Sequence, residues 1–209
     1  MSDPQRVIVY IDGFNLYYGL KDANLKRLLW LNLRALCLKF LQPGQTLSKV
    51  NYFTARVSDT AWDQNKSHRQ NTFLEAVATQ PDVEMYFGKY LSKPVRCNRC
   101  GNEWQKFEEK MTDVNIAVQL LTDAYGDAFD VAILVSGDSD LVGPIQQIRL
   151  FSTNKKVIVA FPPRRNSEDL KKAANAYFRI GKRKLAQSQF EESVKKADGF
   201  VLQRPAKWK

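Results

Sequence analysis

Residues 131–140 read VAILVSGDSD, a run of five apolar residues that leads directly into two serines, a glycine and two aspartates. Residues 7–15, VIVYIDGFN, repeat this arrangement near the start of the chain, where a β-branched run leads into Asp12, Gly13 and Asn15. Short runs rich in valine and isoleucine are typical of strands that are buried on both faces. The two stretches therefore predict parallel strands with acidic residues at their carboxyl ends.

The rest of the chain alternates between strand-like runs and helical stretches. Further strands are expected at residues 50–57, 83–90, 157–161 and, more briefly, 177–180. Helices are expected at residues 31–41, 62–79, 108–124 and 141–151. This alternation indicates an α/β protein with a doubly wound, mostly parallel sheet and helices on both faces. We expect residues 1–163 to form this domain, and residues 164–209 to add a basic C-terminal helix and an extension packed on it.

The charge is unevenly distributed along a chain of otherwise ordinary composition. The 209 residues are 44% hydrophobic and 26% charged, with 32 lysines and arginines against 22 aspartates and glutamates. Residues 164–209 hold 13 basic and five acidic residues, a net charge of +8, which leaves +2 for the rest. A basic segment on a nearly neutral body suggests a polyanionic partner, most often nucleic acid, although a solvated basic helix gives the same pattern.

Composition also argues for a cytoplasmic protein with no membrane partner. No apolar run reaches the roughly 18 residues that a membrane-spanning helix needs. The first residues lack the basic and apolar regions of a signal peptide. Three cysteines, an odd number, argue against a secreted disulfide framework.

Four aspartates are expected to meet at one edge of the sheet. The carboxyl ends of strands in an open α/β sheet meet at the crevice where the winding reverses, which would gather Asp12, Asp138 and Asp140. Asp113 heads an apolar stripe of a predicted helix that should face the sheet, so it joins the same cluster. Asn15 adds a neutral hydrogen-bonding group one turn after Asp12.

Carboxylates gathered in this way need a cation or a proton between them. At an effective dielectric near 20, two like charges about 4 Å apart cost roughly 4 kcal/mol, and protonation or a divalent cation relieves this. Oxygen ligands without a histidine favour Mg²⁺ or Mn²⁺, which the four aspartates would hold. Phosphodiester hydrolysis suits such a site, because metal activates water and offsets charge on phosphoryl oxygens, with Asn15 positioning water or phosphate.

The same motifs have other interpretations. An aspartate after a strand is commonly a helix N-cap, so each of the four taken alone could be a cap rather than a ligand. GDSD also resembles the signature of the GDSL hydrolases, but the only histidine, His68, lies far upstream of Ser139. Haloacid-dehalogenase phosphatases carry a second aspartate where this chain has Phe14. These two classes are therefore disfavoured.

Three blocks of the sequence together resemble one family. They are IDGFN at residues 11–15, KMTD at residues 110–113 and SGDSDL at residues 136–141. Their order and spacing are similar to those of the NYN-domain proteins, the LabA-like branch of the PIN-like nucleases. The resemblance spans about residues 6–163 and implies a PIN-like, Rossmannoid fold with metal-dependent ribonuclease activity. It assigns the acidic site to the four aspartates named above, with Asn15 as their companion.

Cys97 and Cys100, in the sequence CNRCG, form half of a zinc-knuckle pattern. A structural zinc site takes four ligands, and the chain offers only Cys37 and His68 besides, with Cys37 expected in the core. Three interpretations follow. Two subunits of a homodimer donate one pair each, His68 and another residue complete a Zn²⁺ site, or the pair is a free dithiol.

Basic residues are candidates for contacts with RNA phosphates. Arg56 ends the second predicted strand, and Lys110 adjoins the expected acidic site within the predicted helix, where it could equally pair with Asp113 or Glu109. The others belong to the basic C-terminal segment: Arg164, Arg165, Lys171, Lys172, Lys182, Arg183 and Lys184. Cations that follow the phosphates suit single-stranded or structured RNA.

The function predicted from these observations is that of a divalent-metal-dependent ribonuclease. A non-catalytic RNA-binding or regulatory module of the same fold is the main alternative, and a phosphatase of small phosphoesters is a third. Binding of RNA does not separate the first two, because both carry the same basic segment. Turnover does.

Overall fold

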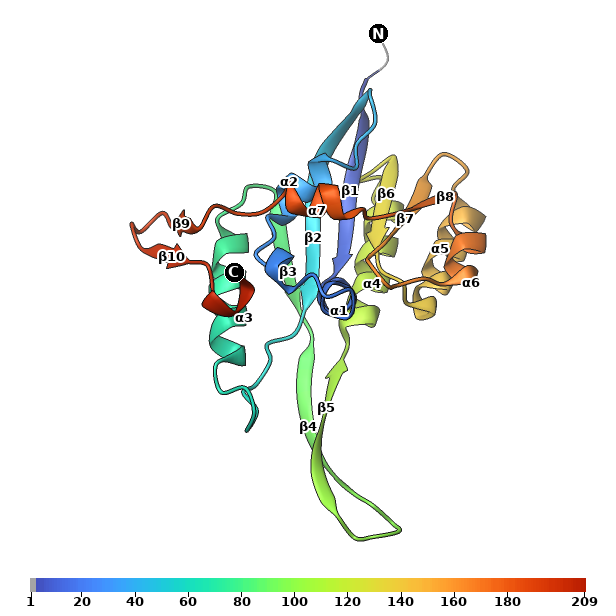
Figure 1. Ribbon diagram of the computed structural model, residues 1–209. Helices are drawn as coiled ribbons and strands as arrows, with labels where there is room; N and C mark the ends of the chain where they lie inside the picture. The colour runs from blue at the N-terminus through green and yellow to red at the C-terminus, as the bar shows by residue number, and fades with distance from the viewer. Residues whose placement is uncertain (1–2) are drawn as a thin grey trace.

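A six-stranded sheet, in which every pairing is parallel, forms the centre of the molecule (Figure 1). The computed structural model describes residues 3–209, apart from the side chains of residues 106–109. In spatial order the strands are β3 (Val83–Phe87), β2 (Gln45–Thr54), β1 (Gln5–Asp12), β6 (Val131–Val135), β7 (Lys156–Phe161) and β8 (Ala176–Arg179). The chain winds outward from β1 on one side and from β6 on the other, so the winding reverses between these two strands.

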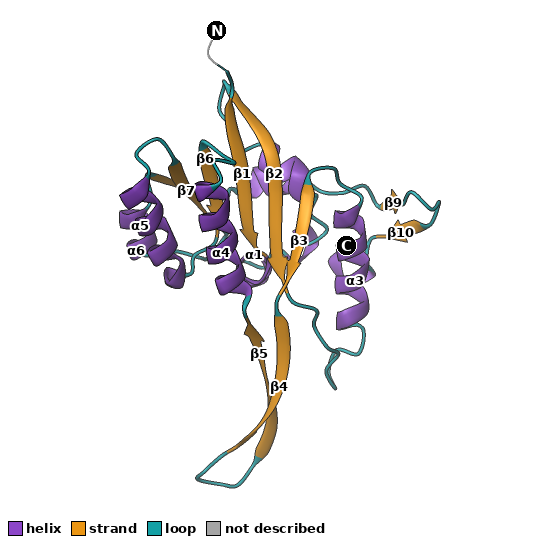
Figure 2. Ribbon diagram, turned by 180° about the vertical axis from the view of Figure 1, so that it is seen from behind, coloured by secondary structure: helices purple, strands orange, loops and turns teal. Residues whose placement is uncertain are grey.

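Helices cover both faces of the sheet, as a doubly wound α/β fold requires (Figure 2). One face carries α1 (Gly13–Asp22), α2 (Leu33–Leu38), α3 (Lys66–Ala78) and α7 (Lys182–Ala186). The other carries α4 (Thr112–Tyr125), α5 (Val142–Phe151) and α6 (Glu168–Ala173). Val7 and Val9 of β1 pack into the first core, whereas Ile8 and Tyr10 pack into the second, because successive side chains of a strand alternate. Within the described residues, no helix is both long and apolar enough to cross a membrane.

A two-stranded antiparallel arm, β4 (Lys89–Arg96) and β5 (Glu103–Lys110), projects from the carboxyl edge of the sheet (Figures 1 and 2). The predicted start of the following helix at residue 108 was wrong. Residues 108–110 pair with β4, and the helix begins at Thr112. The strand expected at residues 83–90 is divided at Gly88, where an added Cβ would lie 2.6 Å from the carbonyl oxygen of Lys110. The two feet of the arm are therefore pressed together.

Residues 164–209 contribute to both cores and extend the sheet. They contain α6, β8 and α7, followed by the small hairpin of β9 (Ser193–Lys195) and β10 (Val201–Gln203). Leu170 is buried in one core and Leu185 in the other. Trp208 is buried and packs edge-on against Phe73 of α3. The short 3-10 helices of the chain are η1 (Lys26–Leu28), η2 (Ser139–Leu141) and η3 (Ala206–Trp208).

Candidate active site

Asp12 ends β1 at the point where the winding of the sheet reverses. One carboxylate oxygen, Oδ1, accepts the backbone N–H of Asn15 at 2.9 Å and so caps α1. The other, Oδ2, accepts the hydroxyl of Ser136 at 2.9 Å. The side chain is almost fully buried. Burial raises the pKa of Asp12 to about 6, and the neighbouring Asp113 and Asp138 add to this rise.

The loop after β6 is tied to the start of α1. Asn15 Oδ1 accepts the backbone N–H of Gly137 at 3.0 Å, and Ser136 Oγ accepts that of Asp138 at 3.1 Å. Asp138 Oδ1 in turn accepts the backbone N–H of Asp140 at 3.0 Å and caps η2. Asp12 and Asp138 are therefore helix caps, and they also line one hollow. The same two aspartates therefore cap helices and line the candidate site.

Asp113 reaches the same place from the first turn of α4. The chain turns from β5 into α4 at Met111, whose φ of 77° lies in the left-handed region that non-glycine residues rarely occupy. The buried face of the helix begins at Thr112 and continues through Ile116. Asp113 was predicted to head this face, but it lies beside it. Burial raises the pKa of Asp113, and Asp138 and Asp140 raise it further.

These carboxylates line a hollow of about 310 Å³ at the carboxyl edge of the sheet. Its walls are Asp12, Phe14, Asn15, Tyr18, Tyr90, Asp113, Asp138 and Arg165. Asp140 is exposed on η2 outside this lining, although its charge still acts on Asp113. The structure therefore gathers three of the four predicted aspartates, together with Asn15, and leaves the fourth at the rim.

The donor set of the hollow fits a hard divalent cation. Asp12, Asp113 and Asp138 offer carboxylate oxygens, and the lining contains neither histidine nor cysteine, which is the ligand chemistry of Mg²⁺ or Mn²⁺ rather than of Zn²⁺. Among the residues described, no three His, Cys, Asp or Glu side chains stand together as a ready-made metal-binding group. The fit therefore rests on the type of ligand and on the mutual repulsion of the carboxylates.

Arg165 brings a positive charge to the acidic hollow. Its Cβ packs so closely on the loop after β6 that a side chain on Gly137 would meet it at 2.9 Å. Its guanidinium pairs with Asp22 at the end of α1. The Nε atom is buried and donates to no acceptor among the described residues. Arg165 is therefore the predicted RNA contact that the structure places at the hollow itself.

Three further predicted contacts lie near this edge of the sheet. Arg56 follows β2, donates to Asn71 Oδ1 at 2.9 Å and stacks over the ring of Phe87 at 5.0 Å. Lys110 ends β5, and exposed Arg164 directly precedes Arg165. None of these three residues lines the hollow.

The remaining predicted RNA contacts lie on two short helices whose residues do not line the hollow. They are Lys171 and Lys172 on α6, and Lys182, Arg183 and Lys184 on α7. Lys171 pairs with Glu168 and lies over the ring of Tyr177. Lys184 donates to the carbonyl oxygen of Lys39 at 2.6 Å, toward the opposite end of the sheet. The structure does not bring these five side chains together with the aspartates.

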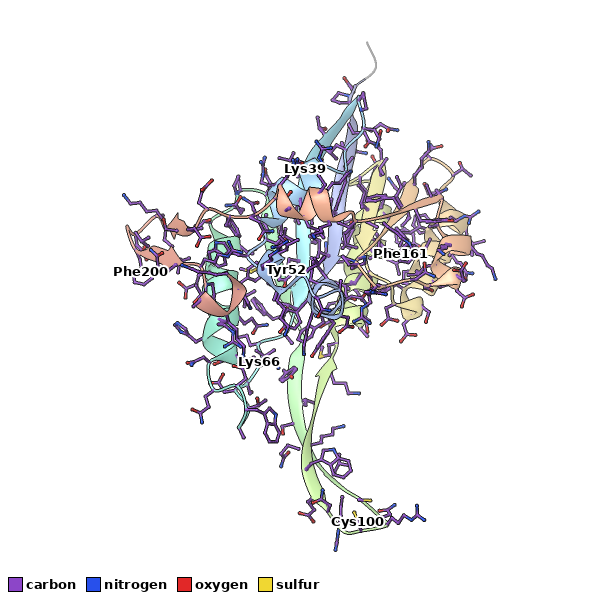
Figure 3. All side chains as sticks on the ribbon, viewed as in Figure 1. Lys39, Tyr52, Lys66, Cys100, Phe161 and Phe200 are labelled. Atoms are coloured by element: carbon purple, nitrogen blue, oxygen red, sulfur yellow. The ribbon has the colours of Figure 1, made fainter. Side chains whose placement is uncertain are left out.

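A second, apolar pocket adjoins the acidic hollow and shares Phe14 and Tyr18 with it. Its walls include the rings of Tyr17, Tyr52, Phe73 and Trp208, with Lys66, Arg69 and Gln70 as polar members. Tyr52 and Lys66 are labelled in Figure 3. Lys66 Nζ donates to Tyr90 Oη at 3.2 Å and lies over that ring. Aromatic walls with cations close by suit a flat, anionic guest.

Sequence reasoning did not single out Ser136, Phe14, Tyr18 or Tyr90. The position of Ser136 in the sequence could have revealed it. Ser136 comes directly after Val135 of β6, and Asp12 comes directly after Ile11, the residue of β1 that pairs with Val135. The aromatic residues carried no such signal. Tyr90 reaches the hollow from the arm, whose pairing the sequence did not reveal.

The fold and the acidic hollow together define a PIN-like α/β protein. The chain belongs to the NYN domain family, which it matches over residues 6–181, and the predicted resemblance is thereby confirmed. This domain places the chain in the PIN-like nuclease superfamily.

The chain is similar to a protein of named activity and to a solved structure, among others. The protein 6-hydroxy-3-succinoylpyridine 3-monooxygenase HspA of Pseudomonas putida (strain DSM 28022 / S16) is 30% identical over 77% of this chain, which spans 61% of that relative's length. A crystal structure of VPA0982, a protein of unknown function from Vibrio parahaemolyticus RIMD 2210633, shares the fold with a TM-score of 0.55 and 21% identity. That likeness covers 91% of this chain and 99% of the other.

Proposed function

We propose that the chain is a divalent-metal-dependent ribonuclease that hydrolyses RNA phosphodiester bonds at the acidic hollow. The observation that carries the proposal is the convergence of Asp12, Asp113 and Asp138, from three separate elements, on one hollow at the reversal of the sheet. Ligands of open α/β folds bind at this position. Membership of the NYN family supports the same class of reaction.

The three aspartates would hold Mg²⁺ or Mn²⁺, with Asp140 close enough to add charge from the rim. When bound, the cation lowers the pKa of a water molecule and neutralises charge on the phosphoryl group. The raised pKa values of Asp12 and Asp113 support this assignment, because burial and like charges disfavour carboxylates that have no cation beside them.

Other residues of the hollow would position the RNA. Arg165 lines the hollow while its guanidinium pairs with Asp22, so it would bring positive charge to a phosphate group bound there. Phe14, Tyr18 and Tyr90 present aromatic rings at the same hollow, and such rings stack on unpaired bases without regard to sequence. Asn15 holds the loop after β6 through Gly137, so its role would be to fix the distance between the two strand ends.

A second candidate function is the binding of a small aromatic acid. The apolar pocket beside the hollow, with Lys66 in its wall, favours a flat guest that carries a negative charge, whereas Arg69 is already paired with Asp63. The name of the similar P. putida protein refers to a succinoylpyridine, which is such a molecule. A saturable rise in melting temperature with an aromatic carboxylate, lost in Lys66→Ala, would support this candidate.

The decisive experiment is cleavage of a labelled single-stranded RNA in Mg²⁺, in Mn²⁺ and in EDTA. Asp138→Asn removes one charge but keeps an oxygen that can cap η2, so folding should survive. We expect its rate to fall at least about 100-fold, which corresponds to about 2.7 kcal/mol. The matched control is Asp127→Asn, the same exchange at the opposite end of the sheet, which should cleave at the wild-type rate.

Each other outcome assigns a different function. Equal cleavage by wild type and Asp138→Asn would place the activity elsewhere or in a contaminant. RNA binding without cleavage in either protein would favour a non-catalytic RNA-binding module. Hydrolysis of a nucleoside monophosphate in preference to RNA would favour a phosphatase.

A further inference from the structure

The tip of the β4–β5 arm carries the two cysteines and lies far from the acidic hollow. The strands of the arm pair from Lys89 and Lys110 at its feet to Arg96 and Glu103 near its tip. Figure 3 shows Cys100 at the end of the arm, beyond the body of the protein. An arm of this kind holds its end groups where another molecule can reach them.

The turn at the tip has a shape that stabilises a thiolate. The backbone N–H of Cys97 donates to the carbonyl oxygen of Asn102 at 2.8 Å, and that of Gly101 donates to the carbonyl oxygen of Cys97 at 2.9 Å. Gly101 has a φ of 70°, a conformation that glycine adopts without strain. The backbone N–H groups of Cys100 and Arg99 donate to the sulfur of Cys97. Thiolates, rather than thiols, are metal ligands.

One chain supplies only half of the ligands that a structural zinc ion takes. Such sites are tetrahedral with four protein ligands, and no third His, Cys, Asp or Glu joins the pair within the part of the chain that the structure describes. Cys37 is fully buried in the core, and His68 lies in the first turn of α3. Completion of a site by His68 is therefore disfavoured, and a tetrahedral site at the tip would need its other ligands from outside the chain.

We propose that the arm tip is half of a zinc site, which the same two cysteines of a second copy complete, so that one Zn²⁺ joins two arms. Two identical pairs related by a twofold axis satisfy the four-ligand geometry with no further donor. Charge favours this occupant. Zn²⁺ with four thiolates carries a net charge of −2. At the tip of each copy Arg96, whose guanidinium lies beside Gly101, pairs with Glu103, while Arg99 adds a further positive charge, so two tips together offset the −2.

The test combines metal analysis with a measurement of mass on the full chain, reduced and purified without chelator in the presence of Zn²⁺. We expect half a zinc ion per chain and a particle of twice the 24.0 kDa chain mass. Cys100→Ser should lose both, with at least a tenfold fall in the dimer fraction. Asn98→Ala, in the same turn but without a sulfur atom, should retain both.

Three results would overturn the proposal. They are one zinc ion per monomeric chain, a dimer that persists in Cys100→Ser, and a protein that stays monomeric and free of zinc. As a further check, Co²⁺ in place of Zn²⁺ should give the strong visible absorption of a tetrahedral thiolate site only in the dimer. None of these readouts depends on RNA cleavage, so the zinc bridge and the proposed nuclease can fail separately.

Discussion

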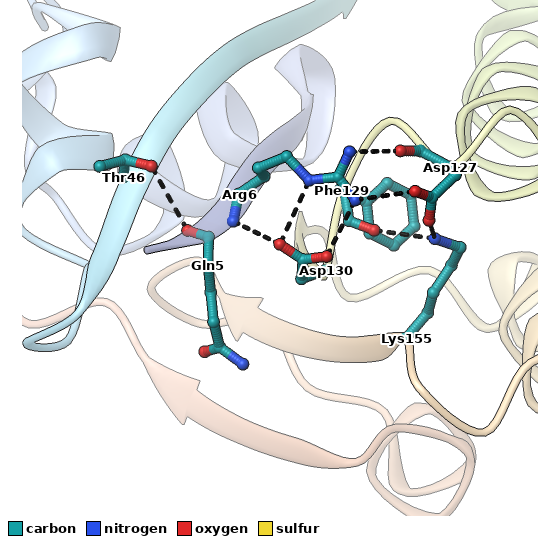
Figure 4. A network of polar contacts seen from close by, with 7 residues as sticks. All are labelled: Gln5, Arg6, Thr46, Asp127, Phe129, Asp130 and Lys155. Carbon is teal, nitrogen blue, oxygen red and sulfur yellow. Dashed lines mark hydrogen bonds and ion pairs between the residues drawn. The ribbon is translucent and has the colours of Figure 1, made fainter. Parts of the chain in front are cut away.

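The two ends of the central sheet treat their carboxylates in opposite ways. At the amino end, Arg6 of β1 donates to both Asp130 and Asp127, and Lys155 donates to Asp127 and to the carbonyl oxygen of Phe129 (Figure 4). Lys155 holds the pKa of Asp127 below its usual value, with help from Arg6, and Arg6 does the same for Asp130. These aspartates are matched by cations within the fold.

At the carboxyl end of the sheet, negative charges outnumber the cations that could pair with them. Asp12 and Asp113 have raised pKa values because they are buried beside other carboxylates. The arginine of this hollow, Arg165, is already paired with Asp22. Negative charge that the fold gathers without neutralising is characteristic of functional sites, where a ligand supplies the missing charge. The comparison therefore separates aspartates that cations of the fold already pair with from those that are proposed to hold a bound cation.

The sharpest way to break this comparison is to remove one charge at each end. Asp113→Asn should lower RNA cleavage at least about 100-fold, because it takes a ligand oxygen charge from the proposed metal site. Asp130→Asn should leave the rate unchanged. Initial rates at saturating Mg²⁺ measure both, with circular dichroism as the check on folding. Comparable losses in the two variants would mean that the ends do not differ in function.

Loss of Arg165 should have the next largest effect. Arg165→Ala should weaken RNA binding about tenfold, which is about 1.4 kcal/mol, and reduce the slope of log affinity against log salt by about one. Lys156→Ala, a basic residue that begins β7 at the amino end, is the matched control. Filter binding across a salt series gives both quantities. If the slope of log affinity against log salt is unchanged in Arg165→Ala, this residue does not contact an RNA phosphate.

Asp113→Asn, which is expected to lower RNA cleavage, should raise the thermal stability of the metal-free protein. Asp113→Asn removes a negative charge from beside Asp138 and Asp140, so its melting temperature in EDTA should exceed that of the wild type by a few degrees. Mg²⁺ should raise the wild-type melting temperature and narrow the gap, because a ligand that binds the folded state stabilises it. Thermal scans in the two buffers test this. A lower melting temperature for Asp113→Asn in EDTA would show that its charge supports the fold.

The smallest expected effect is a change in melting temperature at the amino end of the sheet, where removal of a charge should destabilise the protein. Asp130→Asn should lower the melting temperature at neutral pH, because the variant loses the charge that Arg6 bonds. Since the folded pKa of Asp130 lies below its unfolded value, this stabilisation is present above about pH 4 and fades as the pH falls through the folded value. Melting curves from pH 7 to pH 3 should therefore converge. If the difference in melting temperature between wild type and Asp130→Asn stays constant with pH, the loss of stability comes from packing rather than from charge.

Local sequence was sufficient where one stretch of chain carries the whole signal. The apolar runs that became β1 and β6 and the aspartates that follow them were readable, because strand burial and strand ends are local properties. The helix of Asp113 was expected, but its first turn was misplaced, since residues 108–110 form a strand only by pairing with β4. Pairing partners distant in sequence leave no local pattern.

The sequence by itself determined the fold class, the family motifs and the candidate acidic residues, because side-chain periodicity and strand termini are written along the chain. Only the tertiary structure decided that β1 lies beside β6, that Asp140 stays at the rim, and that Arg165, rather than the lysines of α7, reaches the hollow. It also decided that Cys97 and Cys100 stand at the end of an arm. These outcomes depend on which surfaces pack together, and packing joins residues that are far apart in the chain.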